Sequence, residues 1–195
     1  MKLVGKVALV TGGGRGLGRA AAIAMARAGA RVAIMSRSER ELQGVASVIQ
    51  SLHAEALVCV GDVSREEEVR SALEGLLKRF STLDILVNNA ARIGPARFLE
   101  DADPASWRET MGVNLEGVYL CSRSALGFMA GRGKGKIINV ISGLGQRGFP
   151  RFCAYGVSKA GVIQMTRALS EEFRGLNIQV NAMDPGVMDT GMQEE

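Results

Sequence analysis

A short apolar run that breaks into glycines lies near the start of the chain and limits the folds it can adopt. Residues 7–10 read VALV, and TGGGRGLG follows at 11–18, before an alanine-rich stretch that ends near Gly29. Glycines here permit a tight turn and let backbone N–H groups at a helix N-terminus approach an anion closely. Because this loop follows an apolar strand and precedes a helix, it favours a dinucleotide-binding turn over a plain strand-to-helix turn. A P-loop is excluded, since no Lys-Ser or Lys-Thr pair follows the last glycines.

Apolar runs alternate with helical periodicity along the rest of the chain. The six runs that read as strands are 7–10, 32–35, 57–60, 85–87, 137–141 and 178–182. Few polar residues interrupt several of them, as is typical of parallel strands buried on both faces. The alternation predicts a single α/β domain over residues 1–195, a Rossmann-type doubly wound parallel sheet with helices on both faces. Ligands of such a sheet bind at the carboxyl ends of its strands.

Two helix starts have recognisable signals. Ser64 and Glu67 have the spacing of a capping box, which predicts a side-chain cap at the start of the third helix. Asp103-Pro104 predicts the start of a long helix, with proline at its first helical position and an apolar stripe that includes Trp107 and Met129.

Composition excludes several classes of function. The 24 basic and 20 acidic residues are interleaved without a basic stripe, so we expect no nucleic-acid partner. Three cysteines without C-x-x-C spacing and a single histidine predict neither a metal site nor a disulfide framework. The first residues form neither a signal peptide nor a membrane anchor, and we expect a cytoplasmic protein with reduced thiols and no membrane partner.

The end of the second strand distinguishes between dinucleotides. A site for NAD usually places a carboxylate there, whereas this chain has Ser36-Arg37, with Arg15 in the glycine loop. Two guanidiniums can bind a 2′-phosphate through charge-assisted hydrogen bonds, so we expect NADP(H) to be preferred over NAD(H). The alternative is that Arg37 only pairs with a nearby surface acid such as Glu39.

A tyrosine and a lysine four residues apart mark the candidate catalytic helix. Tyr155 and Lys159 share one helix face, and Ser142 precedes them near the end of the fifth strand. Tyr-x-x-x-Lys alone is common on helices. Its combination with the glycine loop, Asn88-Asn89, Asn114 and Pro185-Gly186 makes a chance occurrence improbable.

These motifs, in this order, resemble those of the short-chain dehydrogenase/reductase family from about residue 6 to 190. NNAA at 88–91 departs from the family's NNAG at Ala91. The resemblance implies a catalytic tetrad of Asn114, Ser142, Tyr155 and Lys159. The residues expected to bind the cofactor are Gly12, Gly14, Arg15, Gly16, Leu17, Gly18, Ser36, Arg37, Asp62, Val63, Asn88, Ala90, Tyr155, Lys159, Pro185, Gly186, Val187 and Thr190.

The tetrad's chemistry follows from its residue types. Tyr155 is the expected proton donor to a carbonyl oxygen, and the Lys159 cation favours its anion. Ser142 is expected to hydrogen-bond the carbonyl oxygen. The resemblance further implies that Lys159 holds the nicotinamide ribose and that Asn114 holds a water in a proton relay. Cys153 has no base nearby in sequence and is expected to be a spectator thiol.

The leading hypothesis is an NADPH-dependent carbonyl reductase, closest by resemblance to the 3-oxoacyl-[acyl-carrier-protein] reductases. An acyl-carrier protein is a possible partner, and Arg132, Lys134 and Lys136 are candidate contacts, with a solvated basic turn as the alternative. The competing hypotheses are a broad-specificity alcohol dehydrogenase working oxidatively and a non-catalytic NADP-binding protein. Phe149 and Phe152 suggest either an apolar substrate or simple loop packing.

The assembly and the end of the chain complete the expectations. We expect at least a homodimer, through the long helices near Asp103 and Tyr155. Family members usually continue with a lid, a final helix and a last strand, which this sequence lacks, so residues 178–183 are expected to form an exposed sheet edge. A longer parent protein, a natural short form and a non-catalytic remnant all remain open.

Overall fold

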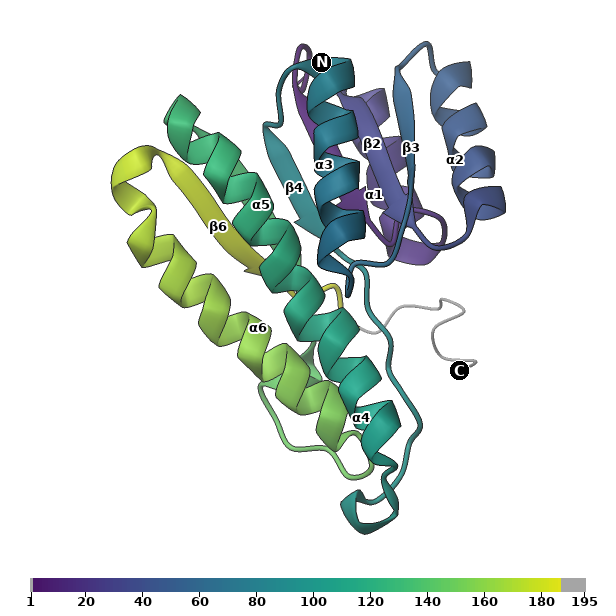
Figure 1. The fold of residues 1–195 in the computed structure, drawn as a ribbon, viewed down its shortest axis with the longest axis vertical. Coiled ribbons are helices and arrows are strands. Elements are labelled where there is room, and N and C mark those ends of the chain that lie inside the picture. Colours follow the sequence, from purple (N-terminus) through teal and green to yellow (C-terminus); the bar gives the residue numbers. More distant parts are fainter. Residues whose placement is uncertain (1, 187–195) are drawn as a thin grey trace.

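A computed structural model describes residues 2–186. Six parallel strands form one sheet in the order β3-β2-β1-β4-β5-β6 (Figure 1). The strands are β1 (Val7–Thr11), β2 (Arg31–Ser36), β3 (Ala56–Val60), β4 (Ile85–Asn88), β5 (Gly135–Val140) and β6 (Ile178–Met183). The predicted doubly wound parallel sheet is confirmed, and the chain order reverses between β1 and β4, where such sheets bind ligands.

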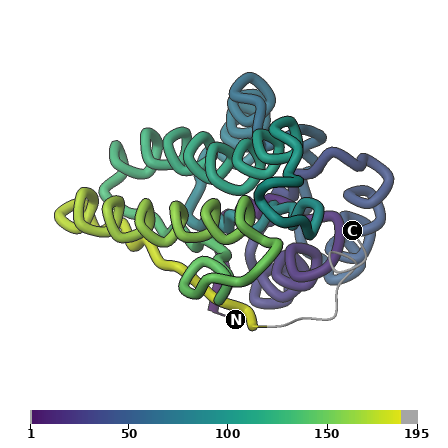
Figure 2. Tube along the Cα trace, turned by 90° about the horizontal axis from the view of Figure 1, so that it is seen from below, coloured from purple at the N-terminus to yellow at the C-terminus, as the bar shows by residue number. Residues whose placement is uncertain are grey.

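Helices cover both faces of this sheet. The α-helices are α1 (Gly16–Arg27), α2 (Glu39–Ser51), α3 (Glu66–Phe80), α4 (Pro104–Met111), α5 (Gly117–Arg132) and α6 (Cys153–Glu172). The short helical turns are η1 (Leu99–Asp101), η2 (Gly112–Glu116), η3 (Gly143–Gly145) and η4 (Arg174–Leu176). Figure 2 shows α5 and α6 running in the same direction, away from the half of the molecule that contains α1 and α2.

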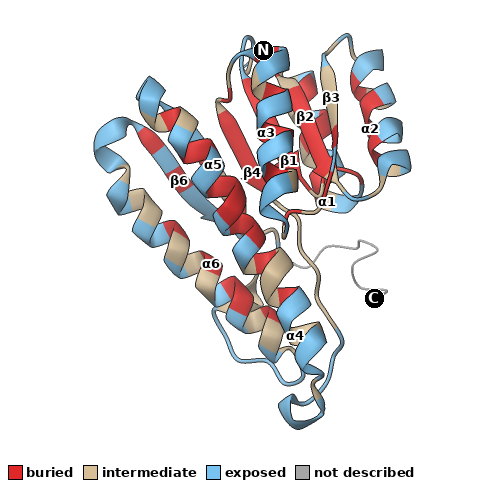
Figure 3. Ribbon diagram, in the orientation of Figure 1, coloured by how far each residue is buried: buried red, intermediate tan, exposed pale blue. Residues whose placement is uncertain are grey.

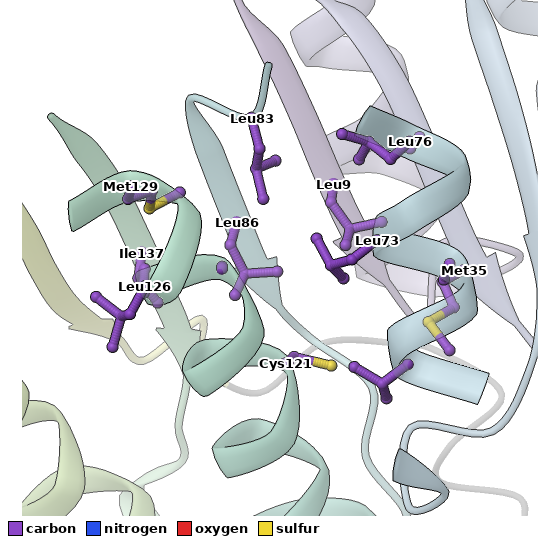
Figure 4. Close-up of a cluster of buried hydrophobic side chains, with 14 of the residues drawn as sticks. Leu9, Met35, Leu73, Leu76, Leu83, Leu86, Cys121, Leu126, Met129 and Ile137 are labelled. Atoms are coloured by element: carbon purple, nitrogen blue, oxygen red, sulfur yellow. The ribbon is translucent and has the colours of Figure 1, made fainter. Parts of the chain in front are cut away.

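Alternate residues of each strand supply two separate cores. Val7 and Leu9 of β1 pack with α3 and α5, while Ala8 and Val10 pack with α1 and α2. Figure 4 shows the first core, where Leu73 and Leu76 of α3 approach the strand side chains and Cys121 of α5 adjoins them. The central strands β1 and β4 are buried, as expected, whereas the edge strand β6 is only partly buried (Figure 3): Ile178 and Val180 are buried, and Gln179 and Asn181 are exposed.

Of the two expected helix starts, the one at Asp103-Pro104 is confirmed and the one at Ser64 is not. Asp103 caps α4, where its carboxylate accepts a 2.9 Å hydrogen bond from the Ser106 N–H, but a π-helical turn, η2, divides the expected long helix. The capping box at Ser64 is wrong. The N-cap of α3 is Arg65, without a side-chain cap, because Ser64 donates both its N–H and its hydroxyl to Asp62. Three glutamates in the first turn of α3 instead complement the helix dipole.

Candidate active site

A cleft of about 1260 Å³ lies at the carboxyl ends of the strands. The glycine loop after β1, Ser36 and Arg37 after β2, and Asp62 after β3 line one part of it. The segments after β4 and β5, together with Tyr155 and Lys159 of α6, line the other part. The topology therefore brings the predicted cofactor loop and the predicted catalytic side chains into one space, as expected for a doubly wound sheet.

The shape of the glycine loop requires glycine at specific positions. Gly12 has φ of +63°, in the left-handed region that side chains disfavour. A Cβ on Gly18 would lie 2.1 Å from the Gly12 carbonyl oxygen and 2.5 Å from Nδ2 of Asn89. The loop thus folds tightly onto the start of α1, and its open backbone forms a cradle that suits a dinucleotide pyrophosphate.

Hydrogen bonds fix this loop to the segment after β4. The Thr11 hydroxyl oxygen accepts from the N–H groups of Asn89 and Ala90 at 3.0 and 3.1 Å. Nδ2 of Asn89 donates to the Thr11 carbonyl at 2.9 Å and to the Gly12 carbonyl at 3.3 Å. These bonds align the two strand ends that form the floor of the cleft.

The ends of β2 and β3 provide polar groups where a cofactor's adenosine would lie. Arg37 is 79% exposed, and its guanidinium lies 3.9 Å from the Asp62 carboxylate and not beside Glu39. Burial opposes the charge of Asp62, but hydrogen bonds from Ser64 and the positive charges of Arg37 and Arg65 lower its pKa overall. The carboxylate therefore stays ionised and holds Arg37 at the mouth of the cleft.

Ser36 has a buried hydroxyl that needs a partner. Its Oγ makes no hydrogen bond within residues 2–186. A Cβ on Gly14 would lie 3.2 Å from this oxygen and 3.0 Å from Oε2 of Glu41, so Ser36, Gly14 and Glu41 converge. A buried hydroxyl without a partner is costly, and a ribose or phosphate oxygen in the cleft would satisfy it. The donor set therefore fits a dinucleotide.

Tyr155, Lys159 and Ser142 meet at the end of β5. The Tyr155 hydroxyl is hydrogen-bonded to Ser142, and Nζ of Lys159 lies 5.7 Å from the centre of the Tyr155 ring. Nζ also donates a 2.8 Å hydrogen bond to the Val140 carbonyl oxygen. Tyr155 and Lys159 are both buried, so the charges that develop on them are poorly screened by water.

Burial dominates the ionisation of this pair. Desolvation raises the pKa of Tyr155, the bond with Ser142 lowers it, and the negative charge of Asp184 raises it further. Desolvation lowers the pKa of Lys159 to about 8. A positive charge in the cleft would lower the pKa of Tyr155, since an opposite charge nearby favours the phenolate.

Asn114 lies in the π-helical turn η2, completely buried. Its Oδ1 accepts from the Arg92 N–H at 2.8 Å, and its Nδ2 donates to the Arg92 carbonyl at 2.9 Å and to Oγ of Ser158 at 3.0 Å. Ser158 in turn donates to the Tyr155 carbonyl at 2.7 Å. The side chain therefore connects the segment after β4 to the catalytic helix.

The predicted site residues fall into three groups. Those that line the cleft are Gly12, Gly14, Arg15, Gly16, Leu17, Ser36, Arg37, Asp62, Val63, Ala90, Ser142, Tyr155, Lys159, Pro185 and Gly186. Three others, Gly18, Asn88 and Asn114, do not line it. Val187 and Thr190 lie outside the described residues.

Asn88 was expected in the cleft but is placed in the core instead. Its Nδ2 donates to Ser122 and to Asn139, at 3.0 and 2.8 Å, and the side chain is 2% exposed. The neighbouring Asn89 lines the cleft, as does Glu41, and neither was predicted from the sequence to bind the cofactor. Gly145 was also missed. A Cβ there would lie 2.8 Å from the Lys159 backbone, so this glycine lets the Ser142 segment pack on α6.

Residues 2–186 contain neither a candidate metal site nor a candidate membrane-spanning helix. No cluster of three or more histidine, cysteine, aspartate or glutamate residues in this range has a geometry that could hold a metal ion. None of the described helices is both long and apolar enough to cross a membrane.

Comparison with known proteins adds independent information. Residues 6–195 match the family model described as short chain dehydrogenase. An uncharacterized oxidoreductase of Thermotoga maritima is 40% identical over 95% of this chain and 73% of its own length. A 3-oxoacyl-[acyl-carrier-protein] reductase of Synechocystis is 35% identical over 98% of this chain and 78% of its own length.

Solved structures agree in fold. The crystal structure of an NAD+-bound xylitol dehydrogenase superposes with a TM-score of 0.96, at 30% identity, covering 99% of this chain and 74% of the other. Levodione reductase also superposes with a TM-score of 0.96, at 33% identity, covering 98% of this chain and 75% of the other.

Proposed function

The chain belongs to the short-chain dehydrogenase family and is an NAD(P)-dependent oxidoreductase, and from this premise we propose that it reduces a carbonyl compound with NADPH. The observation that carries this proposal is the meeting of the buried Tyr155 and Lys159 with Ser142 at the carboxyl end of β5. A protein that only bound the nucleotide would not need an acid, a cation and a hydroxyl arranged together.

A nicotinamide held in the cleft would supply the hydride for the carbonyl carbon, and the protein supplies the proton and the electrostatic environment. Tyr155 donates its phenolic proton to the carbonyl oxygen, while Ser142 hydrogen-bonds that oxygen and stabilises its developing charge. Lys159 provides a positive charge that favours the tyrosinate left behind. Asn114 keeps the Arg92 segment and α6 in register, and the proton relay through it stays a prediction.

The preference for NADPH rests on the groups at the ends of β2 and β3. Arg37 and Arg15 line the cleft beside the Ser36 hydroxyl, and together they suit a 2′-phosphate. Two acidic groups, Glu41 and Asp62, lie in the same region and oppose an additional anion. Arg37→Ser should therefore lower the ratio of NADPH to NADH affinity, and Glu41→Gln should raise it. The NADP assignment would be contradicted if the parent protein bound NADH more tightly than NADPH and if Arg37→Ser left the ratio of the two affinities unchanged.

A 3-oxoacyl thioester is the proposed substrate type, with the Synechocystis relative in support. An acyl-carrier protein is then a proposed partner. The basic turn of Arg132, Lys134 and Lys136 is a poor docking point, because it lies at the amino end of β5, opposite the end that carries Ser142. Arg132 also already has partners in the fold, since its guanidinium lies 3.7 Å from the Asp84 carboxylate and donates a hydrogen bond to Thr82.

The same tetrad can catalyse the reverse reaction, the oxidation of an alcohol. The similarity to xylitol dehydrogenase supports that alternative.

The decisive experiment is NADPH oxidation with S-acetoacetyl-N-acetylcysteamine. Tyr155→Phe should keep its NADPH affinity and lose turnover by about 10²–10⁴-fold, since it removes the proton donor alone. Ser47→Ala, on the exposed side of α2 and away from the cleft, is the control and should keep full turnover. If Tyr155→Phe retained turnover, Tyr155 would not be the proton donor. NADPH binding without turnover of any ketone or alcohol would favour the non-catalytic alternative.

Assembly and location extend the proposal. We propose a homodimer or homotetramer through α4, α5 and α6, where Tyr119 and Val157 are 47% and 45% exposed. If light scattering at micromolar protein concentration gave the mass of a monomer, this proposal would be contradicted.

A cytoplasmic location is proposed because the three cysteines are all unpaired, with Cys59 and Cys121 buried.

A further inference from the structure

A second cavity, of about 30 Å³, lies next to the cleft and shares Ile93 and Tyr155 with it. Its walls come from the segment between β4 and α4, from α4 and from the start of α6. These segments extend beyond the sheet at the lower end of Figures 1 and 3, and residues 95–101 among them are exposed. A substrate that reaches Tyr155 from the main cleft has this cavity directly beside it.

Two arginines, Arg97 and Arg151, line this second cavity. The Arg97 N–H donates a 3.1 Å hydrogen bond to the Arg151 carbonyl, which joins the two segments. The backbone of Arg151 is in the left-handed region, with φ of +70°, and its guanidinium carbon lies 4.9 Å from the centre of the Phe98 ring. The side chain of Arg151 is therefore held against an aromatic surface at the edge of the cavity.

Neither guanidinium is neutralised by a carboxylate. Within the described part of the chain, no aspartate or glutamate oxygen lies within 4.0 Å of Arg97 or Arg151. By contrast, Arg92 nearby is paired with Glu109. The one acidic residue that lines the cavity, Asp103, is already used, because its carboxylate caps α4 through the Ser106 N–H. The cavity thus holds two cationic side chains against one carboxylate.

We propose that Arg97 and Arg151 form an anion subsite that selects carbonyl substrates bearing a negatively charged group near the carbonyl. This assignment rests on the proposed function, since it places the reacting carbonyl at Tyr155. Planar guanidiniums bind carboxylate, sulfonate and phosphate oxygens through paired hydrogen bonds. The small volume of the cavity suits one such group, and the apolar rings of Phe98 and Phe152 beside it suit the carbon chain that carries it.

Matched acid and ester substrates test this subsite. The substrates are the oxo acids from 4-oxopentanoate to 7-oxooctanoate and the methyl ester of each. For at least one chain length, we expect kcat/KM to favour the acid over its ester by about tenfold or more, the effect of one good charged pair. The ratio should fall to about one in Arg97→Gln/Arg151→Gln, and largely recover in Arg97→Lys/Arg151→Lys. Arg147→Gln is the control, because Arg147 is an exposed arginine close in sequence that lines neither space.

Two thioester substrates test whether the subsite binds an anion close to the reacting carbonyl or one far from it. S-acetoacetyl phosphopantetheine carries a phosphate far from its carbonyl, whereas S-acetoacetyl-N-acetylcysteamine is neutral. A preference for the first that is lost in the Gln double variant would show that the two arginines bind a distant phosphate, and would contradict a subsite for an anion near the carbonyl. Selectivity among the oxo acids alone would assign it to a short acidic substrate. Equal kcat/KM for every acid and its ester, or an equal loss of selectivity in Arg147→Gln, would overturn the subsite.

An equilibrium measurement keeps the subsite testable without turnover. Calorimetric titration of the Tyr155→Phe protein, loaded with NADPH, measures the binding of the same oxo acids and esters directly. Saturable binding of an acid that is lost in the Gln double variant, but not with Arg147→Gln, would support the subsite even if no ketone is reduced. In that case only the proposed reaction would fail. No difference between acid and ester binding would overturn the subsite while leaving the reaction untouched.

Discussion

Nζ of Lys159 donates a 2.8 Å hydrogen bond to the carbonyl oxygen of Val140, the last residue of β5. The lysine is 2% exposed, and no carboxylate lies within 4.0 Å of its Nζ in the described residues. The bond therefore fixes a buried cation at the strand end that leads to Ser142. The protein tolerates a charge there that its own packing disfavours, which is common where a group serves a reaction.

Replacing this lysine should make the protein more stable. A pKa lowered from 10.5 to about 8 corresponds to about 3 kcal/mol of unfavourable free energy for the charged form in the fold. Lys159→Met should raise the unfolding free energy at pH 7 by roughly 1–3 kcal/mol, and abolish turnover. Chemical denaturation measures the first effect, and Lys78→Met on the exposed surface of α3 is the control.

The pH dependence of that gain has a definite sign. Below pH 8 the lysine is charged in both the folded and the unfolded state, so the full cost is present. Between about 8 and 10.5 the unfolded state binds more protons, and the stability contributed by this site rises with pH. The difference between Lys159→Met and the parent should therefore shrink toward pH 10.5. A difference that is constant with pH would mean that the fold does not lower the pKa of Lys159.

Asp184 should tune the pH profile of the reaction. Its negative charge raises the pKa of Tyr155, and its Oδ1 accepts a 3.0 Å hydrogen bond from the Gly186 N–H. Asp184→Asn keeps an acceptor there and removes the charge, so the pKa of Tyr155 should fall. Alcohol oxidation needs the phenolate, and the rising limb of its kcat/KM profile should move to lower pH. If kcat/KM rose over the same pH range in Asp184→Asn as in the parent, a group other than Tyr155 would control that rise.

Asn114 should matter for stability as well as for activity. Asn114→Ala leaves the N–H and the carbonyl of Arg92 without their partners in a buried region, at a cost of roughly 2–4 kcal/mol. Thermal unfolding should show this loss, whereas Ser124→Ala on the exposed side of α5 should not. A variant with unchanged stability and lost turnover would instead favour the proton relay as its main role.

Gly18 should not accept even a methyl group. The new Cβ would lie 2.1 Å from the Gly12 carbonyl oxygen, a backbone atom that cannot move without opening the glycine loop. Gly18→Ala should weaken NADPH binding and lower the melting temperature. Gly44→Ala is the matched control, because its Cβ would have open space in α2, and it should stabilise the protein by roughly 0.5–1 kcal/mol. Tight NADPH binding by Gly18→Ala would contradict the cradle.

Local signals in the sequence predicted much of this site. The glycine loop, the Tyr155-Lys159 spacing and the Asp103 cap each depend on residues within seven positions of one another, so their geometry can be read from the chain. The capping box failed because Ser64 had a competing partner, Asp62, two residues earlier. Periodicity also predicted one long helix, but it cannot detect the single extra residue per turn that makes η2 a π-helical turn.

What the sequence by itself determined is the kind of fold and the identity of the reacting groups, because buried-strand patterns and helical spacing are local. The tertiary structure alone decided which of two adjacent asparagines faces the cleft. Asn88 points into the core toward Ser122 and Asn139, and Asn89 points to Thr11 and Gly12. It also brought Arg97 and Arg151 together across 54 residues of chain. Such choices depend on how strands and loops pack in space, because a side chain's surroundings come from distant segments and not from its neighbours in sequence.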